Sequence, residues 1–220
     1  GSKGVHKKNI KLLGDFPLIS YTIKSALKSN LSDVIVSTDC NDIADVTKQE
    51  GANLPFMRPE KFATDTASSL DVIVHALRTY EEMNNTSIDA IMMLQPTTPF
   101  RSTEDINCAI ELLQNNPEAD SVISVVDVGG THPARMKYLE NGYLVDPEFC
   151  EAKENQNRQE LIPMYIRNGA IYLSRRETLL TRSFKGNKSM AYIMPAIRSV
   201  NIDTLSDFQY AEWQYINHLK

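Results

Sequence analysis

The sequence predicts an α/β protein, a three-layer sandwich with a mostly parallel, partly mixed sheet. Two features of the first half predict it: short apolar, β-branched runs, and segments of helical spacing between them. The runs are 33–38, 88–94 and 121–127, and the helical segments are 17–29, 41–50, 66–82 and 103–115. Strands and helices that alternate in this way are typical of a parallel sheet covered on both faces.

The second half of the chain has a different pattern, which is why we expect a mixed sheet. Asn141-Gly142 is a strong turn dipeptide and predicts a hairpin over 136–145. Three further strands are predicted at 170–174, 190–194 and 200–203, and a closing helix at 205–219. Because we find no repeat, low-complexity tract or linker, we predict one domain over residues 1–220.

Residues at the helix ends support the helical segments. Asn41 is a candidate N-cap of the second helix, and Gly51 follows its last residue. Asp65 or Thr66 is predicted to cap the third helix, where Ser68 also begins a capping-box pattern.

Composition excludes several classes of function. The 220 residues carry a formal net charge of −5, which argues against general nucleic-acid binding because such binding favours basic faces. The longest unbroken apolar run, 90–94, is far shorter than the roughly 20 residues that span a bilayer. The three cysteines are widely separated, which favours reduced thiols in a cytoplasmic protein.

The opening stretch GSKGVHKKNI combines glycines with lysines. Glycine lets backbone N–H groups approach an anion and lysine supplies countercharge, so the stretch suits a triphosphate. Taken alone, it could instead be a cloning remnant at Gly1-Ser2 followed by a solvated basic arm. The first regular element after it is a helix, although the first βα turn of an open parallel sheet usually holds phosphate. We therefore expect a hydrophobic strand upstream of Gly1.

Two later loops carry polar groups suited to a ligand. Gln95 to Arg101 follows a predicted strand, at the end where α/β proteins bind ligands. Gln95 offers a donor and an acceptor, and Arg101 offers a forked cation. The alternative is a rigid connection with a surface arginine. The stretch 63–71 has more hydroxyl groups than a helix cap requires, although an ordinary capped helix would also explain it.

The last predicted strand ends in a candidate metal site. Asn201 and Asp203 are two residues apart, so their side chains should project together. Two oxygen ligands completed by waters and phosphates suit Mg²⁺. The alternative is that Asp203 or Thr204 only caps the next helix.

The strand near residue 170 is a further candidate. Asn168, Ala170 and Tyr172 are predicted to share one face, although a turn and a strand with a core tyrosine would also explain them. Among the histidines, His75 is predicted to be packed and His132 to be the freer.

Taken together and in this order, five stretches resemble the bacterial acylneuraminate cytidylyltransferases, which make CMP-sialic acid and its relatives. The stretches are SKGVHKKN, RPEKFATDTASS, MLQPTTPFR, RQELIPMYIRNGAIY and RSVNIDTLSDF. They cover essentially the whole chain, and collinear motifs of this length are far more specific than a lone glycine-rich loop. Their register also identifies Gly1 and Ser2 as native residues.

The resemblance implies a fold like that of the nucleotide-diphospho-sugar transferases, with CTP as co-substrate and Mg²⁺ as cofactor. The anomeric hydroxyl of a nine-carbon 2-keto sugar acid attacks the α-phosphate of CTP, and pyrophosphate leaves. The family members are homodimers, and the hairpin elaboration, at about 131–163 here, reaches into the partner's site. We expect a cytoplasmic enzyme with neither nucleic acid nor membrane as partner.

The resemblance also assigns residues by matching motifs. Ser2, Lys3, Lys8 and Asn9 would contact the triphosphate and nucleotide, and Arg58, Ala67 and Ser69 would contact the cytosine. Gln95, Arg158, Asn168 and Tyr172 would contact the sugar acid, and Asp203 and Asn201 would bind the metal. Lys3, Lys8 and Asp203 would be catalytic. Phosphoryl-type transfer depends mainly on positioning and charge stabilisation, so lysines and a metal matter more than a protein nucleophile.

The chain departs from the family at one metal position, where Asn201 replaces an aspartate. An amide oxygen ligates Mg²⁺ without bringing charge, so we expect Asp203 to be the main protein ligand. The alternatives are a cytidylyltransferase for the eight-carbon lipopolysaccharide acid, a catalytically weak nucleotide-binding relative, and a basic-arm interaction module. The choice among sialic, legionaminic and pseudaminic acids would depend on the loops 131–136 and 148–163.

Overall fold

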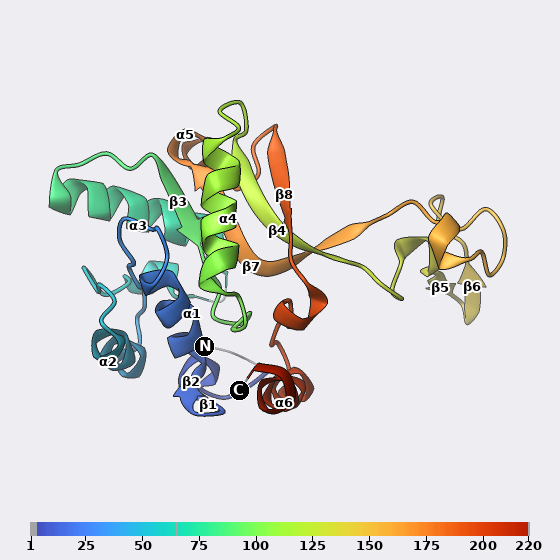
Figure 1. Ribbon diagram of the computed structural model, residues 1–220, viewed down its shortest axis with the longest axis horizontal. Helices are drawn as coiled ribbons and strands as arrows, with labels where there is room; N and C mark the ends of the chain where they lie inside the picture. The colour runs from blue at the N-terminus through green and yellow to red at the C-terminus, as the bar shows by residue number, and fades with distance from the viewer. Residues whose placement is uncertain (1–3, 65, 220) are drawn as a thin grey trace.

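The computed structural model describes residues 4–64 and 66–219, and its centre is a four-stranded sheet with the order β3-β7-β4-β8 (Figure 1). The strands are β3 (Ala90–Met93), β4 (Ser121–Asp127), β7 (Tyr165–Arg175) and β8 (Ser189–Ile193). β7 is antiparallel to both β3 and β4, whereas β8 is parallel to β4. All but β7 therefore point the same way, and the predicted mixed sheet is confirmed.

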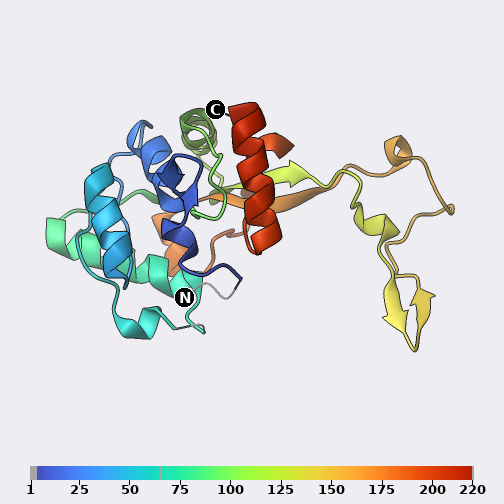
Figure 2. The same ribbon diagram turned by 90° about the horizontal axis from the view of Figure 1, so that it is seen from below.

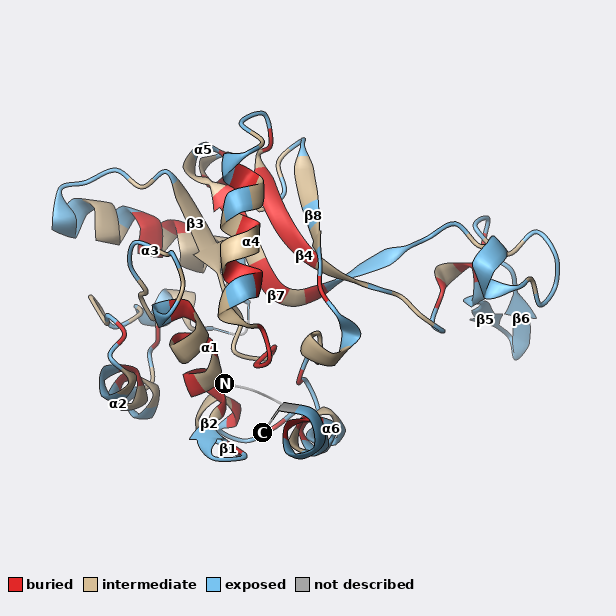
Figure 3. Cartoon of the chain, in the orientation of Figure 1, coloured by how far each residue is buried: buried red, intermediate tan, exposed pale blue. Residues whose placement is uncertain are grey.

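Helices cover both faces of this sheet, as the alternation predicts. They are α3 (Ser69–Asn84), α4 (Thr103–Gln114) and α5 (Arg176–Leu180). α4 lies over one face, where Ile106 and Ala109 pack with Val122 and Ile171 in the main core. α3 lies on the other side of the sheet (Figure 2). Buried residues accordingly gather where α4 faces the strands (Figure 3).

Two more helices, α1 (Leu18–Leu27) and α2 (Asn41–Glu50), pack against each other beside the sheet. α2 ends at Glu50, and Gly51 follows it as predicted, because glycine tolerates the left-handed φ of +84° found there. The prediction that Asn41 caps this helix is wrong: the N-cap is Cys40, without a side-chain cap bond.

Two predicted strands do not form. The segment 33–38 makes only isolated parallel bridges to the segment 53–57. The segment 200–203 belongs to no strand, although the Ile202 N–H donates to the Thr97 carbonyl at 2.8 Å. A strand requires a continuous ladder with a neighbour, and an apolar β-branched run alone indicates only that a segment is buried.

The third helix begins later than predicted. α3 starts at Ser69 because Ser68 is its N-cap: the Ser68 Oγ accepts a hydrogen bond from the Asp71 N–H at 3.1 Å. The capping-box signal at Ser68 was therefore the correct one. Thr66 precedes the helix, and Asp65 lies outside the described residues.

The closing helix covers the predicted range, 205–219, and packs on the start of the chain. α6 (Leu205–Gln214) begins with a capping box of Thr204 and Asp207 and continues as a π-helical turn over Tyr215–Leu219. It lies against a small hairpin formed by β1 (Leu12–Leu13) and β2 (Phe16–Pro17). Within the described residues, none of the helices has the length and apolar character needed to cross a bilayer.

The predicted hairpin around Asn141-Gly142 is confirmed. It comprises β5 (Tyr138–Glu140) and β6 (Tyr143–Val145), and both turn residues have a positive φ, 52° and 88°. It lies at the tip of an arm that projects from the sheet beyond β4 and β7 (Figure 1). This arm falls within the range predicted for the elaboration, 131–163.

Of the predictions for His75 and His132, the first is confirmed and the second is wrong. His75 is packed, as predicted, between two phenylalanine rings whose centroids lie 5.1 and 4.6 Å away. The prediction that His132 is the freer is wrong. His132 is buried; its Nδ1 accepts a bond from the Ala134 N–H at 3.1 Å and its Nε2 donates to the Ile162 carbonyl at 2.9 Å. His132 thus joins the two sides of the arm.

Candidate functional site

Three segments that are far apart in the sequence meet at Gly169 in β7. A Cβ atom on Gly169 would lie 2.9 Å from Gln95 Oε1, 3.4 Å from Thr98 Oγ1 and 3.7 Å from Asn201 Oδ1. Gly169 also has a φ of +77°, which side chains rarely adopt. A glycine here thus allows the loop after β3, the strand β7 and the segment before α6 to converge.

A cationic and acidic edge lies next to this junction. The Lys8 ammonium donates to the Ile202 carbonyl at 2.7 Å and lies 3.8 Å from Asp203 Oδ1. The Asn201 amide donates to Asp203 Oδ2 at 2.6 Å. A Cβ atom on Gly4 would collide with the Asp203 carbonyl oxygen, so the opening loop passes directly against this edge. The structure therefore brings Lys8, Asn201 and Asp203 together.

Asp203 has a carboxylate that is available to a ligand. Its side chain is 69% exposed, and Thr204, not Asp203, caps α6. Within residues 4–64 and 66–219, no group of three or more His, Cys, Asp or Glu side chains could hold a metal. One carboxylate and one amide oxygen fit a Mg²⁺ ion that is shared with substrate phosphates, because Mg²⁺ commonly keeps few protein ligands.

The other residues assigned to the triphosphate are less fully described. Ser2 and Lys3 lie outside the described residues, and Asn9 lies within a short 3₁₀ turn. Lys7, at a left-handed φ of 49°, turns to α2 and forms an ion pair with Asp42 at 2.8 Å.

Of the residues assigned to cytosine, Ala67 and Ser69 lie at the start of α3, whereas Arg58 is bonded to Ser37. Arg58 is held by Ser37: its Nε donates to the Ser37 hydroxyl at 3.1 Å and its Nη2 to the Ser37 carbonyl. Burial lowers the pKa of the Arg58 guanidinium, and the nearby Asp39 partly opposes that shift. Ala67 precedes the helix, and Ser69 is its first residue, where N–H groups remain unpaired within the helix.

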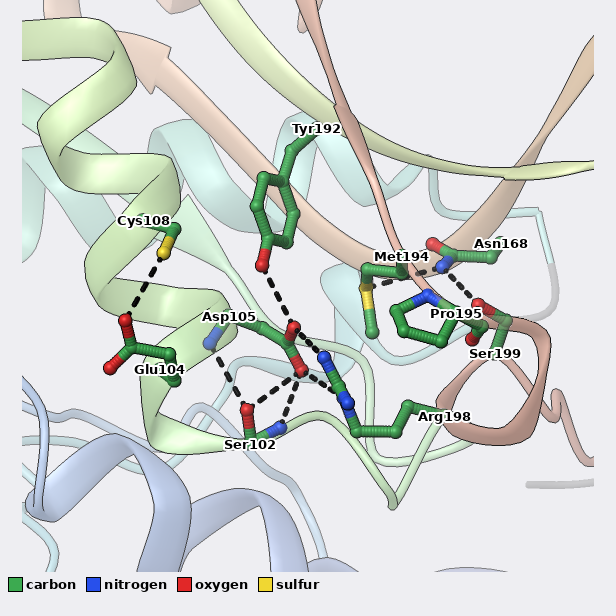
Figure 4. A network of polar contacts seen from close by, with 10 residues as sticks. All are labelled: Ser102, Glu104, Asp105, Cys108, Asn168, Tyr192, Met194, Pro195, Arg198 and Ser199. Atoms are coloured by element: carbon green, nitrogen blue, oxygen red, sulfur yellow. Dashed lines mark hydrogen bonds and ion pairs between the residues drawn. The ribbon is translucent and has the colours of Figure 1, made fainter.

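Two of the residues assigned to the sugar acid differ in exposure. Arg158 is exposed and forms an ion pair with Asp127 at 3.0 Å, at the base of the arm. Asn168 is buried, and both ends of its amide are hydrogen-bonded. Its Oδ1 accepts from the Ser124 hydroxyl at 2.6 Å. Its Nδ2 donates to Ser199 at 2.9 Å (Figure 4). Asn168 thus links β4, β7 and the segment that carries Asn201.

The prediction that Asn168 and Tyr172 share a face is wrong. Asn168 contacts Met194 and Ser199, whereas the Tyr172 ring lies against Phe184, with centroids 5.8 Å apart. The strict alternation of a strand fails between them because β4 and β7 shift register there and Gly169 has a positive φ.

A cavity of about 650 Å³ lies on the sheet face opposite α4. Leu70, next to Ser69, lines it from α3, and Phe184, against Tyr172, lines it from the loop after α5. Its lining includes the cations Arg167, Arg182 and Lys185 and the apolar Ile123, Val125 and Met190. Arg182 already forms an ion pair with Asp71 at 2.6 Å, so Arg167 and Lys185 supply the charge that suits an anionic ligand with apolar groups. Sequence reasoning missed Phe184 because no motif marks the loop, which reaches the site only once β8 pairs with β4.

The expectation that Arg101 is a surface cation or a ligand is wrong. Its side chain is 2% exposed, and its Nη1 donates to the carbonyls of Thr98 and Ala170, both at 3.1 Å. Its Nη2 donates to Thr22 Oγ1 at 2.8 Å, and burial lowers the pKa of Arg101 to about 9. Arg101 thus fastens the Gln95 loop to β7 and α1.

A mixed α/β sheet with polar side chains at its strand ends is the arrangement in which α/β proteins bind nucleotides and other ligands. The chain belongs to the cytidylyltransferase family, whose family model matches residues 1–213. It is 34% identical over 219 residues to a CMP-N,N'-diacetyllegionaminic acid synthase of Legionella pneumophila, with 96% of this chain and 90% of that protein covered.

Other relatives are longer than this chain. It is 36% identical over 213 residues to an N-acylneuraminate cytidylyltransferase of Escherichia coli, covering 96% of this chain and 49% of that protein. The chain thus spans about half the length of this relative. Homologues in Streptococcus agalactiae that bear the same name match at 33% identity, again over 49% of their length.

Solved structures share the fold at low sequence identity. A CMP:2-keto-3-deoxy-manno-octonic acid synthetase in complex with CTP matches with a TM-score of 0.70 and 15% identity, covering 100% of this chain and 95% of that one. A 4-diphosphocytidyl-2C-methyl-D-erythritol synthase matches with a TM-score of 0.66 and 13% identity, over 94% of both chains. These likenesses establish the α/β fold.

Proposed function

We propose that this protein transfers CMP from CTP to the anomeric hydroxyl of a nine-carbon 2-keto sugar acid. The observation that supports this proposal most strongly is that Lys8, Asn201 and Asp203 lie together, next to the point where the Gln95 loop reaches Gly169. The proposal also draws on the relatives, since those from Legionella and E. coli are both named for making CMP derivatives of such acids.

The reaction needs charge stabilisation and positioning more than a protein nucleophile. The sugar hydroxyl oxygen forms the new bond to the α-phosphorus, the bond to the β-phosphate breaks, and the hydroxyl proton leaves to solvent. Lys8, whose ammonium donates to the Ile202 carbonyl, would supply positive charge to phosphoryl oxygens that gain negative charge. Mg²⁺, held by Asp203 and Asn201, would neutralise the triphosphate.

The remaining assigned residues would orient the two substrates. Gln95 presents a side-chain amide at the junction, and Arg158 carries the forked guanidinium that best recognises a carboxylate. Tyr172 and Phe184 would pack on the acyl or deoxy groups of the sugar. Arg58 and the start of α3, with Ala67 and Ser69, would hold the cytosine.

The test is a panel of acids. The purified protein is incubated with CTP, Mg²⁺ and each of sialic, legionaminic, pseudaminic and eight-carbon acids; pyrophosphate is measured and the product identified by mass. We expect a CMP-sugar from at least one nine-carbon acid. A product from the eight-carbon acid alone would instead support the alternative hypothesis of a cytidylyltransferase for the lipopolysaccharide sugar acid. CTP binding without any pyrophosphate would identify a nucleotide-binding relative.

We further propose that the protein is a homodimer joined through the arm. The arm exposes large apolar side chains, which mark interaction surfaces when they are contiguous. They include Tyr138, Leu139, Tyr143 and Leu144, at 57%, 74%, 77% and 76% exposure. Light scattering should give twice the chain mass for the wild type and a monomer for Leu139→Ser/Leu144→Ser; a monomeric wild type would contradict the proposal.

We also propose that the enzyme is cytoplasmic. All three cysteines are free thiols, which is in keeping with a reducing compartment.

A further inference from the structure

A buried ion pair joins the start of α4 to the segment that follows β8 (Figure 4). The Asp105 side chain is fully buried, and its two oxygens accept a fork from Arg198: Nε to Oδ2 at 2.9 Å and Nη2 to Oδ1 at 2.8 Å. Tyr192 donates to the same carboxylate at 2.9 Å, and the Ser102 N–H at 2.8 Å.

Capping alone does not explain this arrangement. A capping box needs only the N-cap residue and the third residue of the helix, here Ser102 and Asp105. Arg198 comes from 93 residues further along the chain and occupies both oxygens. Burial alone would raise the pKa of Asp105, but the bonds from Arg198, Ser102 and Tyr192 outweigh burial and lower it. Asp105 is thus a charged anchor for Arg198.

The segment held by this anchor carries the proposed metal ligands. Between the end of β8 and the start of α6 the chain forms no strand. The bond from the Ile202 N–H to the Thr97 carbonyl and the packing of Val200 and Ile202 in a core cluster hold the later part of this segment, and the side-chain contacts of Arg198 hold the earlier part. Arg198 is followed by Ser199, which bonds to Asn168, and Asn201 and Asp203 come next. An arginine fork on a carboxylate fixes direction as well as distance, unlike a single lysine contact.

We propose that Arg198 is a positioning residue for the metal and triphosphate end of the site. Through its bidentate interaction with Asp105, Arg198 fixes the position of Asn201 and Asp203 relative to Lys8. This inference rests on the proposed function, because it assigns the Asn201–Asp203 edge to Mg²⁺ and CTP. Groups hydrogen-bonded directly to metal ligands typically change metal affinity or activity by about 10–100-fold when they are altered. We expect an effect in that range from Arg198, which acts on Asn201 and Asp203 through the backbone of residues 199–203.

The test uses Arg198→Lys, which keeps the charge and loses the fork. Its matched control is Arg176→Lys: Arg176 forms a fork on Glu81 at 2.8 and 3.2 Å, with an additional contact to Glu177, away from the proposed metal edge. The two arginine side chains are equally exposed, at 31% and 30%. The two carboxylates differ in burial, at 0% exposure for Asp105 and 12% for Glu81, so thermal unfolding should report a loss in both variants and the larger loss in Arg198→Lys.

The decisive readout is CTP binding by calorimetry, measured with EDTA and across a Mg²⁺ titration in the absence of sugar acid. Arg198→Lys should bind CTP like the wild type in EDTA and need about 10–100-fold more Mg²⁺ for half of the enhancement. Arg176→Lys should follow the wild-type Mg²⁺ curve. The inference is overturned if Arg198→Lys keeps that curve, if both variants shift equally, or if Mg²⁺ does not strengthen wild-type binding.

This readout is independent of turnover. If no sugar acid yields pyrophosphate but the Mg²⁺ curve of Arg198→Lys shifts as expected, the proposed transfer reaction fails and the positioning role stands. If CMP-sugar forms and the curve does not shift, the positioning role fails alone. Tyr192→Phe, which removes one bond to Asp105 and leaves the Arg198 fork, should keep the wild-type curve; a shift as large as that of Arg198→Lys would count against the fork.

Discussion

Replacing Gly169 by alanine should separate the stability of the fold from the assembly of the site. At a φ of +77°, a side chain costs about 1–2 kcal/mol of backbone strain. The new Cβ would stand 2.9 Å from Gln95 Oε1 and 3.7 Å from Asn201 Oδ1. The Gln95 tip can move away at little cost in stability, but it then leaves its place in the site.

The strain should lower the unfolding temperature by about 2–8 °C, since 1 kcal/mol corresponds to about 2–4 °C in a protein of this size. Activity should fall much further, by about 100-fold in kcat/KM for the sugar acid, because a misplacement of about 1 Å can cost that much. Thermal unfolding and pyrophosphate release measure the two effects.

Gly51→Ala is the matched control. Gly51 has a similar φ of +84°, and nothing lies within 4 Å of a Cβ atom placed there. It should lose comparable stability and keep wild-type kcat/KM. The reasoning is refuted if Gly169→Ala retains wild-type kcat/KM or if Gly51→Ala loses as much activity.

Three further predictions follow from single side chains. Asp203→Ala should cut Mg²⁺-dependent activity by about 100-fold and leave the unfolding temperature unchanged, because the side chain is 69% exposed; full Mg²⁺-dependent activity would exclude Asp203 as the main ligand. Phe184→Ala should raise KM for the sugar acid about tenfold with little change in KM for CTP, and an equal rise in both would place Phe184 elsewhere. Burial, with the charges of Lys61 and Arg58, lowers the pKa of His75 in the folded protein. The unfolded chain therefore binds the proton more readily, and the stability of the protein should fall as the pH drops below about 6.5. Unfolding temperatures measured between pH 8 and 5 should fall less steeply for His75→Phe than for the wild type, and identical profiles would contradict this.

The sequence predicts the elements whose signals are local. β4 was predicted at 121–127 because a β-branched run stands between polar boundaries, and the end of α2 because glycine is needed at residue 51. The segments 33–38 and 200–203 were not correctly predicted, because strand formation depends on a neighbour that local pattern does not reveal.

The candidate site likewise combines residues placed by local pattern with residues placed by tertiary contacts. Asn201 and Asp203 were expected to lie together because residues two apart in an extended chain project alike, and their side chains are hydrogen-bonded. Arg101 could not be assigned correctly, because nothing in a single sequence shows that its guanidinium is surrounded by carbonyl groups from β7 and its own loop. Phe184 likewise reaches the cavity only through tertiary packing.

Phosphorus NMR of one reaction mixture tests the central claim most directly. The protein is mixed with CTP, Mg²⁺ and the nine-carbon acid that gives most product, and the phosphorus signals are followed over time. We predict that a CMP-sugar phosphodiester and pyrophosphate appear in equal amounts as CTP disappears, and that neither appears without the acid. Inorganic phosphate formed without a phosphodiester, or CTP consumption that does not depend on the acid, would contradict the transfer of CMP.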